Sequence, residues 1–143
     1  MSGNRSGSSE PAWGDRMEAV AIVAALVLVE YMVIVWLTGQ ARGRHGVAAP
    51  AITGHPVFER WMRVQGNTVE QLVIFFPGLW LFSHYVHAEA AAALGLVFLV
   101  GRFLFARGYV ADPARRGPGF ILSYLSNAVL VLGGLAGAIA AAL

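Results

Sequence analysis

The 143-residue chain has no cysteine and no lysine, and only 13% of its residues are charged. The absence of cysteine excludes disulfides and every metal, redox or nucleophilic site that needs a thiol from the protein. The low charge is unusual, because about 25% of the residues in ordinary globular domains are charged. A soluble domain of this length needs a more charged surface, so the composition argues against an ordinary soluble fold.

Hydrophobic residues make up 57% of the chain, against about 45–50% in average domains. They form runs long enough to cross the ~30 Å hydrocarbon core of a bilayer as helices. We therefore expect an all-α fold, an integral membrane four-helix bundle, with its helices at residues 19–37, 56–82, 90–110 and 120–143. Residues 1–16 are rich in Ser and Gly and predict a mobile polar tail, which leaves residues 17–143 as a single domain.

All ten basic residues are arginines, and four of them lie in two of the predicted connections. Arg42 and Arg44 follow the first helix, and Arg115 and Arg116 precede the fourth, whereas the turn between the second and third helices has none. Arginine-rich connections stay on the cytoplasmic side of a membrane. We expect a multi-pass protein of the bacterial inner membrane with both termini on the opposite side. The net charge of +2 gives no argument for nucleic acid.

A polar stripe marks the first half of the second predicted helix. Arg60, Arg63, Asn67 and Glu70 are spaced by 3, 4 and 3 residues, which puts all four on one helix face. A charged side chain at the bilayer centre costs about 2.5–3.5 kcal/mol on insertion scales. The stripe must therefore face the bundle interior, another subunit or a water-filled cavity.

The third predicted helix has a matching face, formed by Arg102, Phe105 and Tyr109 at spacings of 3 and 4. We expect Glu70 and Arg102 to pair within the membrane. One glutamate cannot neutralise all the nearby arginines, so the site stays positive and suits a small anion with carboxylates, which arginine binds bidentately. A purely structural polar network is the alternative, but such a network tends to balance its charges.

Two motifs resemble those of a known membrane family. The segment Phe58-Glu59-Arg60-x-x-Arg63-x-Gln65-x-Asn67-x-x-Glu70 resembles the signature of the MAPEG family (membrane-associated proteins in eicosanoid and glutathione metabolism). Gly101-Arg102, Gly108-Tyr109 and Arg116 are similar to the pattern of its third helix and following loop. The resemblance covers residues 42–143. It implies a homotrimer of four-helix protomers, with a glutathione site between neighbouring subunits that opens to the cytoplasm.

The resemblance also implies roles for single residues. It implies a glutathione-binding set made of Arg42, Arg63, Gln65, Asn67, Glu70, Arg102 and Tyr109. Arg116 is implied as the catalytic residue beside the sulfur, with Arg115 as the alternative because a one-residue shift of the loop would exchange them. Gln71 and Phe105 stand where the leukotriene synthase branch of the family has tyrosine, which removes two hydroxyl contacts.

The chemistry of glutathione agrees with an arginine beside its sulfur. An ordinary thiol has a pKa of about 8.5, so only a few per cent is thiolate at neutral pH. A guanidinium stabilises the thiolate and lowers that pKa. We expect a membrane-bound glutathione transferase in detoxification that conjugates the thiolate to lipophilic electrophiles, with glutathione as co-substrate and no metal. Glutathione peroxidase activity towards lipid hydroperoxides is equally compatible with these residues.

Two other classes remain open. A non-enzymatic lipid-binding or scaffolding protein would share the fold, although the retained set of Arg63, Asn67 and Glu70 favours glutathione binding. Glu30 lies within the first apolar run, where a small proton-coupled multidrug exporter would have its essential carboxylate. Such an exporter has no need for the polar stripe of the second helix.

Overall fold

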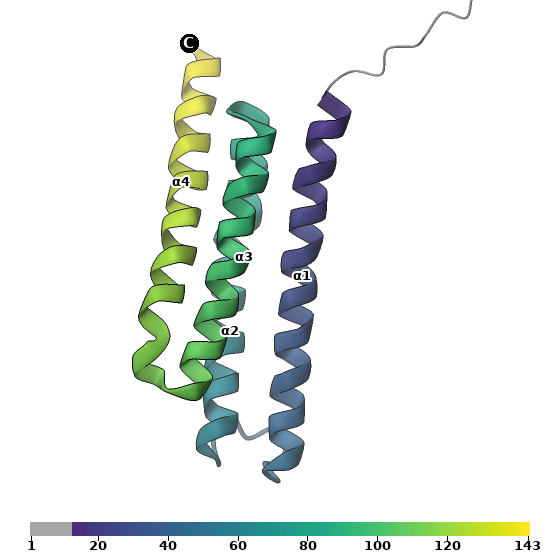
Figure 1. Ribbon diagram of the computed structural model, residues 1–143, viewed down its shortest axis with the longest axis vertical. Helices are drawn as coiled ribbons and strands as arrows, with labels where there is room; N and C mark the ends of the chain where they lie inside the picture. Colours follow the sequence, from purple (N-terminus) through teal and green to yellow (C-terminus); the bar gives the residue numbers. More distant parts are fainter. Residues whose placement is uncertain (1–12) are drawn as a thin grey trace, which may run out of the picture.

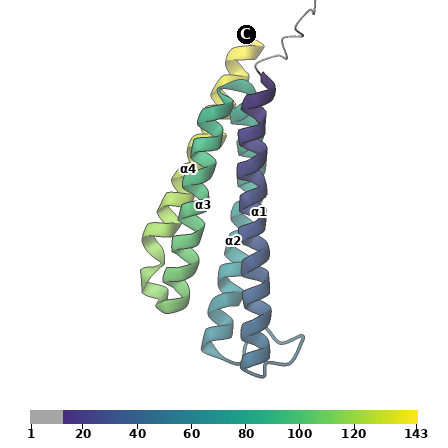
Figure 2. The ribbon, with the colours of Figure 1, turned by 45° about the vertical axis from the view of Figure 1, so that its right-hand side comes forward.

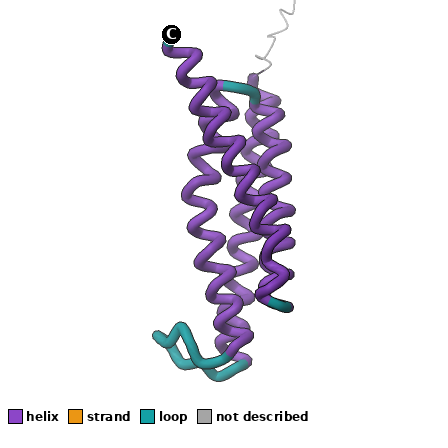
Figure 3. Tube along the Cα trace, turned by 90° about the vertical axis from the view of Figure 1, so that its left-hand side faces the viewer, coloured by secondary structure: helices purple, strands orange, loops and turns teal. Residues whose placement is uncertain are grey.

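The computed structural model describes residues 13–143, which form four long helices and one short 3₁₀ helix (Figure 1). These are α1 (Trp13–Arg44), α2 (Pro56–Tyr85), α3 (Ala88–Ala111), η1 (Pro113–Arg116) and α4 (Gly117–Ala142). The long helices run side by side, and the described residues contain no strand (Figure 3). The predicted all-α four-helix fold is confirmed. Of the predicted tail, residues 1–12 lie outside the described part and residues 13–16 belong to α1.

Three segments of the described chain are long and apolar enough to cross a membrane: Met17–Arg44, Ala88–Ala111 and Pro113–Ala142. The exception is α2, because its first half contains the polar stripe. It nevertheless packs against α1, α3 and α4 along the bundle. The chain is a multi-pass integral membrane protein in which α2 brings polar side chains to the level of its apolar neighbours.

The connections are shorter than expected. Helix α2 continues to Tyr85 and α3 begins at Ala88, where the Nδ1 atom of His87 accepts a 3.3 Å hydrogen bond from the backbone N–H of Ala90. Residues 113–119, predicted as loop, are η1 and the first turn of α4. Asp112 begins η1, because its Oδ1 atom accepts a 3.0 Å hydrogen bond from the backbone N–H of Ala114. This capping keeps the segment that contains Arg116 helical.

The two ends of the bundle differ in chemistry. The start of α1 and the C-terminus lie at one end, and the α1–α2 loop and η1 lie at the other (Figures 1 and 2). The arginines of both connections, Arg42, Arg44, Arg115 and Arg116, are therefore gathered at one end. This arrangement agrees with a chain that crosses the membrane an even number of times.

Aromatic stacking and close backbone approach hold the helices together. The fully buried rings of Phe75 in α2 and Phe98 in α3 are stacked with their centroids 4.1 Å apart. Helices α3 and α4 meet at Gly101, where an added Cβ would lie only 2.7 Å from the Oγ atom of Ser123. Small residues allow helices in lipid to approach this closely, and the contact sets how α4 is placed against α3.

Candidate functional site

Four of the predicted glutathione-site residues line one cavity, which we call the arginine cavity. It has a volume of about 370 Å³ and lies within the usual size range of small-molecule sites. Its lining consists of Arg63, Asn67, Phe105, Tyr109, Arg116 and Phe120. These residues come from α2, α3, η1 and α4, so the cavity exists only because the folded bundle brings these elements together.

Local structure positions each polar group of the arginine cavity. Arg63 and Asn67 are four residues apart on α2 and therefore lie on one face, about one turn apart. Arg116 reaches the cavity from the end of η1, which packs tightly against α3. An added Cβ at Gly108 would lie 2.7 Å from the backbone oxygen of Arg115. Gly108 therefore permits the approach that brings Arg116 near Tyr109.

No group within residues 13–143 neutralises the charges in the arginine cavity. Arg63 and Arg116 are exposed, and neither has a hydrogen bond or ion pair with any part of residues 13–143. The buried Oδ1 atom of Asn67 also has no hydrogen-bond partner among the described residues. A structural network would satisfy these groups internally, whereas a binding site leaves them for its ligand.

A second cavity adjoins the first and shares Arg63 and Tyr109 with it. It has a volume of about 320 Å³ and is completed by Pro56, Glu59 and Arg60. Arg60 is already engaged, since its Nη1 atom donates hydrogen bonds of 3.0 and 3.2 Å to the backbone oxygens of residues 110 and 111. These bonds tie the start of α2 to the end of α3 beside the site.

Arg102 is completely buried behind the arginine cavity rather than lining it. Its Nη2 atom donates a 2.8 Å hydrogen bond to the Oγ1 atom of Thr68, and its guanidinium carbon lies 4.2 Å from the centre of the Phe105 ring. The Nε and Nη1 atoms have no hydrogen-bond partner in the described part of the chain. Glu30 of α1 is the carboxylate that interacts electrostatically with this guanidinium. Arg102 thus supports the cavity wall through Phe105.

The predicted pair of Glu70 and Arg102 is not formed within the described chain. Glu70 is exposed, whereas Arg102 bonds to Thr68, which is buried. At 3.6 residues per turn, positions 68 and 70 point about 200° apart around α2. Arg102 meets the face of α2 that is turned into the bundle, and the polar stripe lies on another face.

The remaining predicted residues lie outside the arginine cavity in this protomer. Arg42 is held by the α1–α2 loop, where its Nη1 atom donates a 2.8 Å hydrogen bond to the backbone oxygen of Ala51. Its guanidinium also stacks 4.5 Å from the Phe58 ring. Gln65 is half-buried and contributes nothing to the cavity lining. Arg115 lies 3.8 Å from Asp112, so the loop presents Arg116, not Arg115, to the cavity.

The sequence argument missed three features of this region. Thr68 was overlooked because it is uncharged, although it is the hydrogen-bond partner of Arg102. Phe120 was assigned only to a membrane span, yet it lines the arginine cavity. Asn127 is a polar residue within an apolar run, so an interhelical hydrogen bond is its expected role. Its partner Gln71 on α2 has no local signal, because these residues are 56 positions apart.

A further cavity, the amide cavity, lies one turn deeper between α2 and α4. Its volume is about 250 Å³, and it is lined by Gln71, Ile74, Tyr124, Asn127, Ala128, Val131 and Leu132. Gln71 is one turn beyond Asn67, and Tyr124 is one turn beyond Phe120, whose ring it stacks against at 6.0 Å. The two cavities therefore follow each other along the same pair of helices, from the charged end towards the middle of the bundle.

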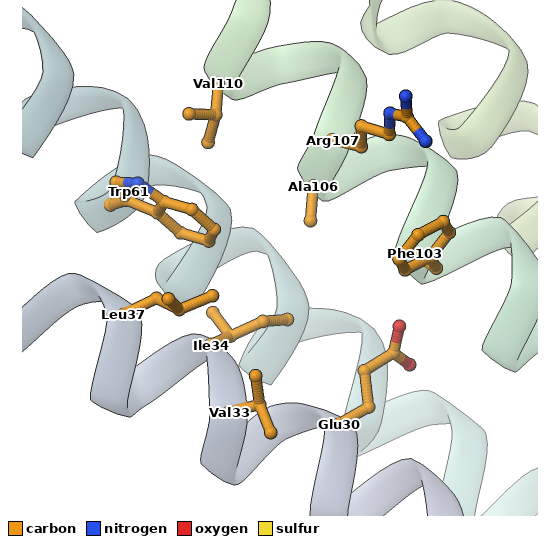
Figure 4. A pocket seen from close by; sticks show the side chains of 9 residues that line it. All are labelled: Glu30, Val33, Ile34, Leu37, Trp61, Phe103, Ala106, Arg107 and Val110. Carbon is orange, nitrogen blue, oxygen red and sulfur yellow. The ribbon is translucent and has the colours of Figure 1, made fainter.

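The opposite side of the bundle has a cavity of different character, the Glu30 cavity (Figure 4). It has a volume of about 340 Å³ and is lined by Glu30, Val33, Ile34, Leu37, Trp61, Phe103, Ala106, Arg107 and Val110. Glu30 extends from α1 towards α3, while the guanidinium of Arg107 points away from it (Figure 4). Apart from these two residues the lining is apolar.

Comparisons with known proteins show which proteins this chain is similar to. Residues 20–136 match the model of the MAPEG family. The chain is 49% identical over 115 residues to an uncharacterized protein of Synechocystis, covering 80% of this chain and 84% of the relative. It is 38% identical over 118 residues to human microsomal glutathione S-transferase 2, covering 82% and 80%. It is 35% identical over 102 residues to leukotriene C4 synthase of Cavia porcellus, covering 69% and 68%. Because the family match spans most of its length, the chain belongs to the MAPEG family.

Proposed function

We propose that the protein is a membrane-bound glutathione transferase. The observation that carries this proposal is the arginine cavity, in which Arg63 and Arg116 are exposed and have no partner within residues 13–143. The names of two relatives, a microsomal glutathione S-transferase and a leukotriene C4 synthase, support a glutathione-dependent reaction. Glutathione is the co-substrate, bound by Arg63, Asn67 and Tyr109.

The charges of glutathione match the groups of the cavity. Its two carboxylates suit guanidinium groups such as that of Arg63, which bind a carboxylate with paired hydrogen bonds. Arg116 lies at the sulfur and stabilises the thiolate, which raises the fraction of the reactive species. The thiolate then attacks an electrophilic carbon, a carbon–sulfur bond forms, and the leaving group departs with its electron pair.

The second substrate reaches the sulfur through the amide cavity. This cavity continues from the arginine cavity along α2 and α4, and its rim includes the exposed side chains of Ile74, Tyr124 and Leu132. An apolar electrophile dissolved in lipid can enter such a groove sideways. Conjugation of such electrophiles would serve detoxification. The same thiolate could instead reduce lipid hydroperoxides, so peroxidase activity is tested alongside transferase activity.

We infer that the working form is a homotrimer. Arg63 and Glu70 are exposed on α2, although charges facing lipid near the bilayer centre cost about 2.5–3.5 kcal/mol each. A neighbouring protomer against this face removes that cost. It also gives a role to Gln65 and Glu70, which lie on α2 without lining the cavity of their own protomer. The site then opens at the arginine-rich end, which faces the cytoplasm of a bacterial inner membrane, with both termini opposite.

The proposal is tested by isothermal titration of the detergent-solubilised protein with glutathione. We expect saturable binding together with the ultraviolet absorbance of a bound thiolate. Turnover with a chlorinated aromatic compound and with a lipid hydroperoxide then separates transferase from peroxidase activity. A protein that binds no glutathione would instead be a non-enzymatic lipid-binding or scaffolding member of the fold, and native mass spectrometry checks the trimer.

A further inference from the structure

The amide cavity contains a polar group that its packing leaves unsatisfied. Asn127 is 3% exposed and lies in the middle of α4. Its Nδ2 atom donates hydrogen bonds of 3.0 Å to the Oε1 atom of Gln71 and 3.3 Å to the backbone oxygen of Gln71. The Oδ1 atom is buried and has no hydrogen-bond partner within the described chain.

The orientation of this amide follows from its neighbours. The backbone oxygen of Gln71 can only accept a hydrogen bond, so the amide of Asn127 must turn its nitrogen towards α2. The oxygen of Asn127 is therefore the group left over, and it can only accept. A buried acceptor without a donor is unfavourable by about 1–3 kcal/mol. Ala128, Val131 and Leu132 have no donor to offer, and Tyr124, whose ring stacks on Phe120, forms no hydrogen bond with this oxygen.

We propose that Asn127 is a specificity-determining residue that accepts a hydrogen bond from an alcohol group on the lipophilic substrate. This inference rests on the proposed transferase function. An alcohol fits better than a carboxylate, because an ionised carboxylate can only accept hydrogen bonds and so cannot donate one to the Oδ1 atom of Asn127. A carboxylate would also bring a charge to the middle of the bundle. The selected substrate class is a long apolar electrophile that has a hydroxyl group on its tail.

The length of the helix sets where that hydroxyl must be. Phe120 lines the arginine cavity, and Asn127 follows it seven residues later on α4. At 1.5 Å per residue, the two levels are about 10 Å apart along the helix. An electrophile that reacts at the arginine cavity therefore places a hydroxyl about 10 Å along its tail beside Asn127.

The experiment compares two probes in the detergent-solubilised protein with saturating glutathione. One probe is a linear enone with a hydroxyl about 10 Å along its tail, and the other is the same enone without the hydroxyl. The thiolate adds to the β carbon of either probe, the π electron pair moves to the carbonyl oxygen, and a proton from water completes the adduct without a leaving group. In the wild-type protein we expect kcat/KM to favour the hydroxylated probe by about threefold to tenfold. In Asn127→Leu the preference should vanish, while glutathione binding and thiolate absorbance stay unchanged.

Ser126→Ala is the matched control, because the hydroxyl of Ser126 donates a hydrogen bond to the backbone oxygen of Leu94 in α3 and does not line the amide cavity. It should keep the preference for the hydroxylated probe. Equal kcat/KM for the two probes in the wild-type protein, or an unchanged preference in Asn127→Leu, would overturn the proposal. The wild-type comparison decides even where the variant does not fold.

A second measurement separates this inference from the proposed function. Native mass spectrometry without glutathione counts binding of a saturated long-chain alcohol and of the matching alkane. Preferential binding of the alcohol, lost in Asn127→Leu, supports the role of Asn127 even if the protein proves to have no transferase activity. Equal binding of the two probes, or binding of neither, overturns it.

Discussion

The arginine cavity and the Glu30 cavity are nearly equal in size, at about 370 and 340 Å³, yet they differ in chemistry. The first joins two exposed, unpartnered arginines with an unpartnered amide oxygen, all within residues 13–143. The second is apolar except for Glu30 and Arg107, and Glu30 already interacts electrostatically with buried Arg102. Arg107 is also exposed and unpaired within residues 13–143, so the arginine cavity differs in having two such arginines beside a buried amide oxygen and no carboxylate.

Among the substitutions that test this comparison, replacing Arg116 should have the largest effect on turnover. Arg116→Ala removes the guanidinium assigned to the sulfur, so turnover should fall about 10²–10³-fold, as when an electrostatic stabiliser is lost. Glutathione should still bind through Arg63, but the thiolate absorbance should disappear. Arg115→Ala is the control, because Arg115 lies beside Asp112 and does not line the cavity. Unchanged thiolate absorbance in Arg116→Ala would eliminate the assignment.

The placement of η1 should be the next most sensitive feature. In Gly108→Ala the new methyl group would lie 2.7 Å from the backbone oxygen of Arg115 and push η1 away from α3. Since a displacement of about 1 Å can cost about 10²-fold in rate, turnover should fall by at least tenfold. Gly117→Ala meets nothing within 4 Å and should keep wild-type turnover. Equal rates in both variants would show that η1 does not position Arg116.

Arg63 tests the binding of glutathione itself. Arg63→Ala removes a charged hydrogen-bond donor from the arginine cavity, so the glutathione Kd measured by titration should rise about tenfold or more. Arg107→Ala removes an exposed arginine from the Glu30 cavity instead. The glutathione Kd of Arg107→Ala should stay within about twofold of wild type. A similar loss in both variants would mean that overall positive charge, not the arginine cavity, attracts glutathione.

Replacing Glu30 should have the smallest effect on glutathione binding. It is also the most direct test of whether the protein is a proton-coupled exporter. Glu30→Gln changes a residue that does not line the arginine cavity, so the glutathione Kd should stay within about twofold of wild type. Vesicles containing the wild-type protein should show no proton-driven efflux of a lipophilic cationic dye. Efflux that is present in the wild type and abolished in Glu30→Gln would identify the protein as a transporter.

Local signals in the sequence predicted much of this protein. Long apolar runs predict helices wherever a membrane core must be crossed, and all four helices are present. Helical spacing placed Arg63 on one face of α2 with Asn67, and the structure brings both to one cavity. Helical spacing also singled out Tyr109 on the third helix, and the family resemblance added the role of Arg116; both line that same cavity. Their roles towards glutathione remain predictions.

The sequence by itself determined which segments form helices and which residues share a helix face, because hydrophobicity and the 3.6-residue period act within a single helix. Only the tertiary structure decided how each helix is rotated against its neighbours, since that depends on contacts between distant segments. Close packing of Gly101 against Ser123 and of Gly108 against η1 sets two of these contacts. In the folded bundle Arg102 donates a hydrogen bond to Thr68 instead of pairing with Glu70, and Arg116 lines one cavity with Arg63.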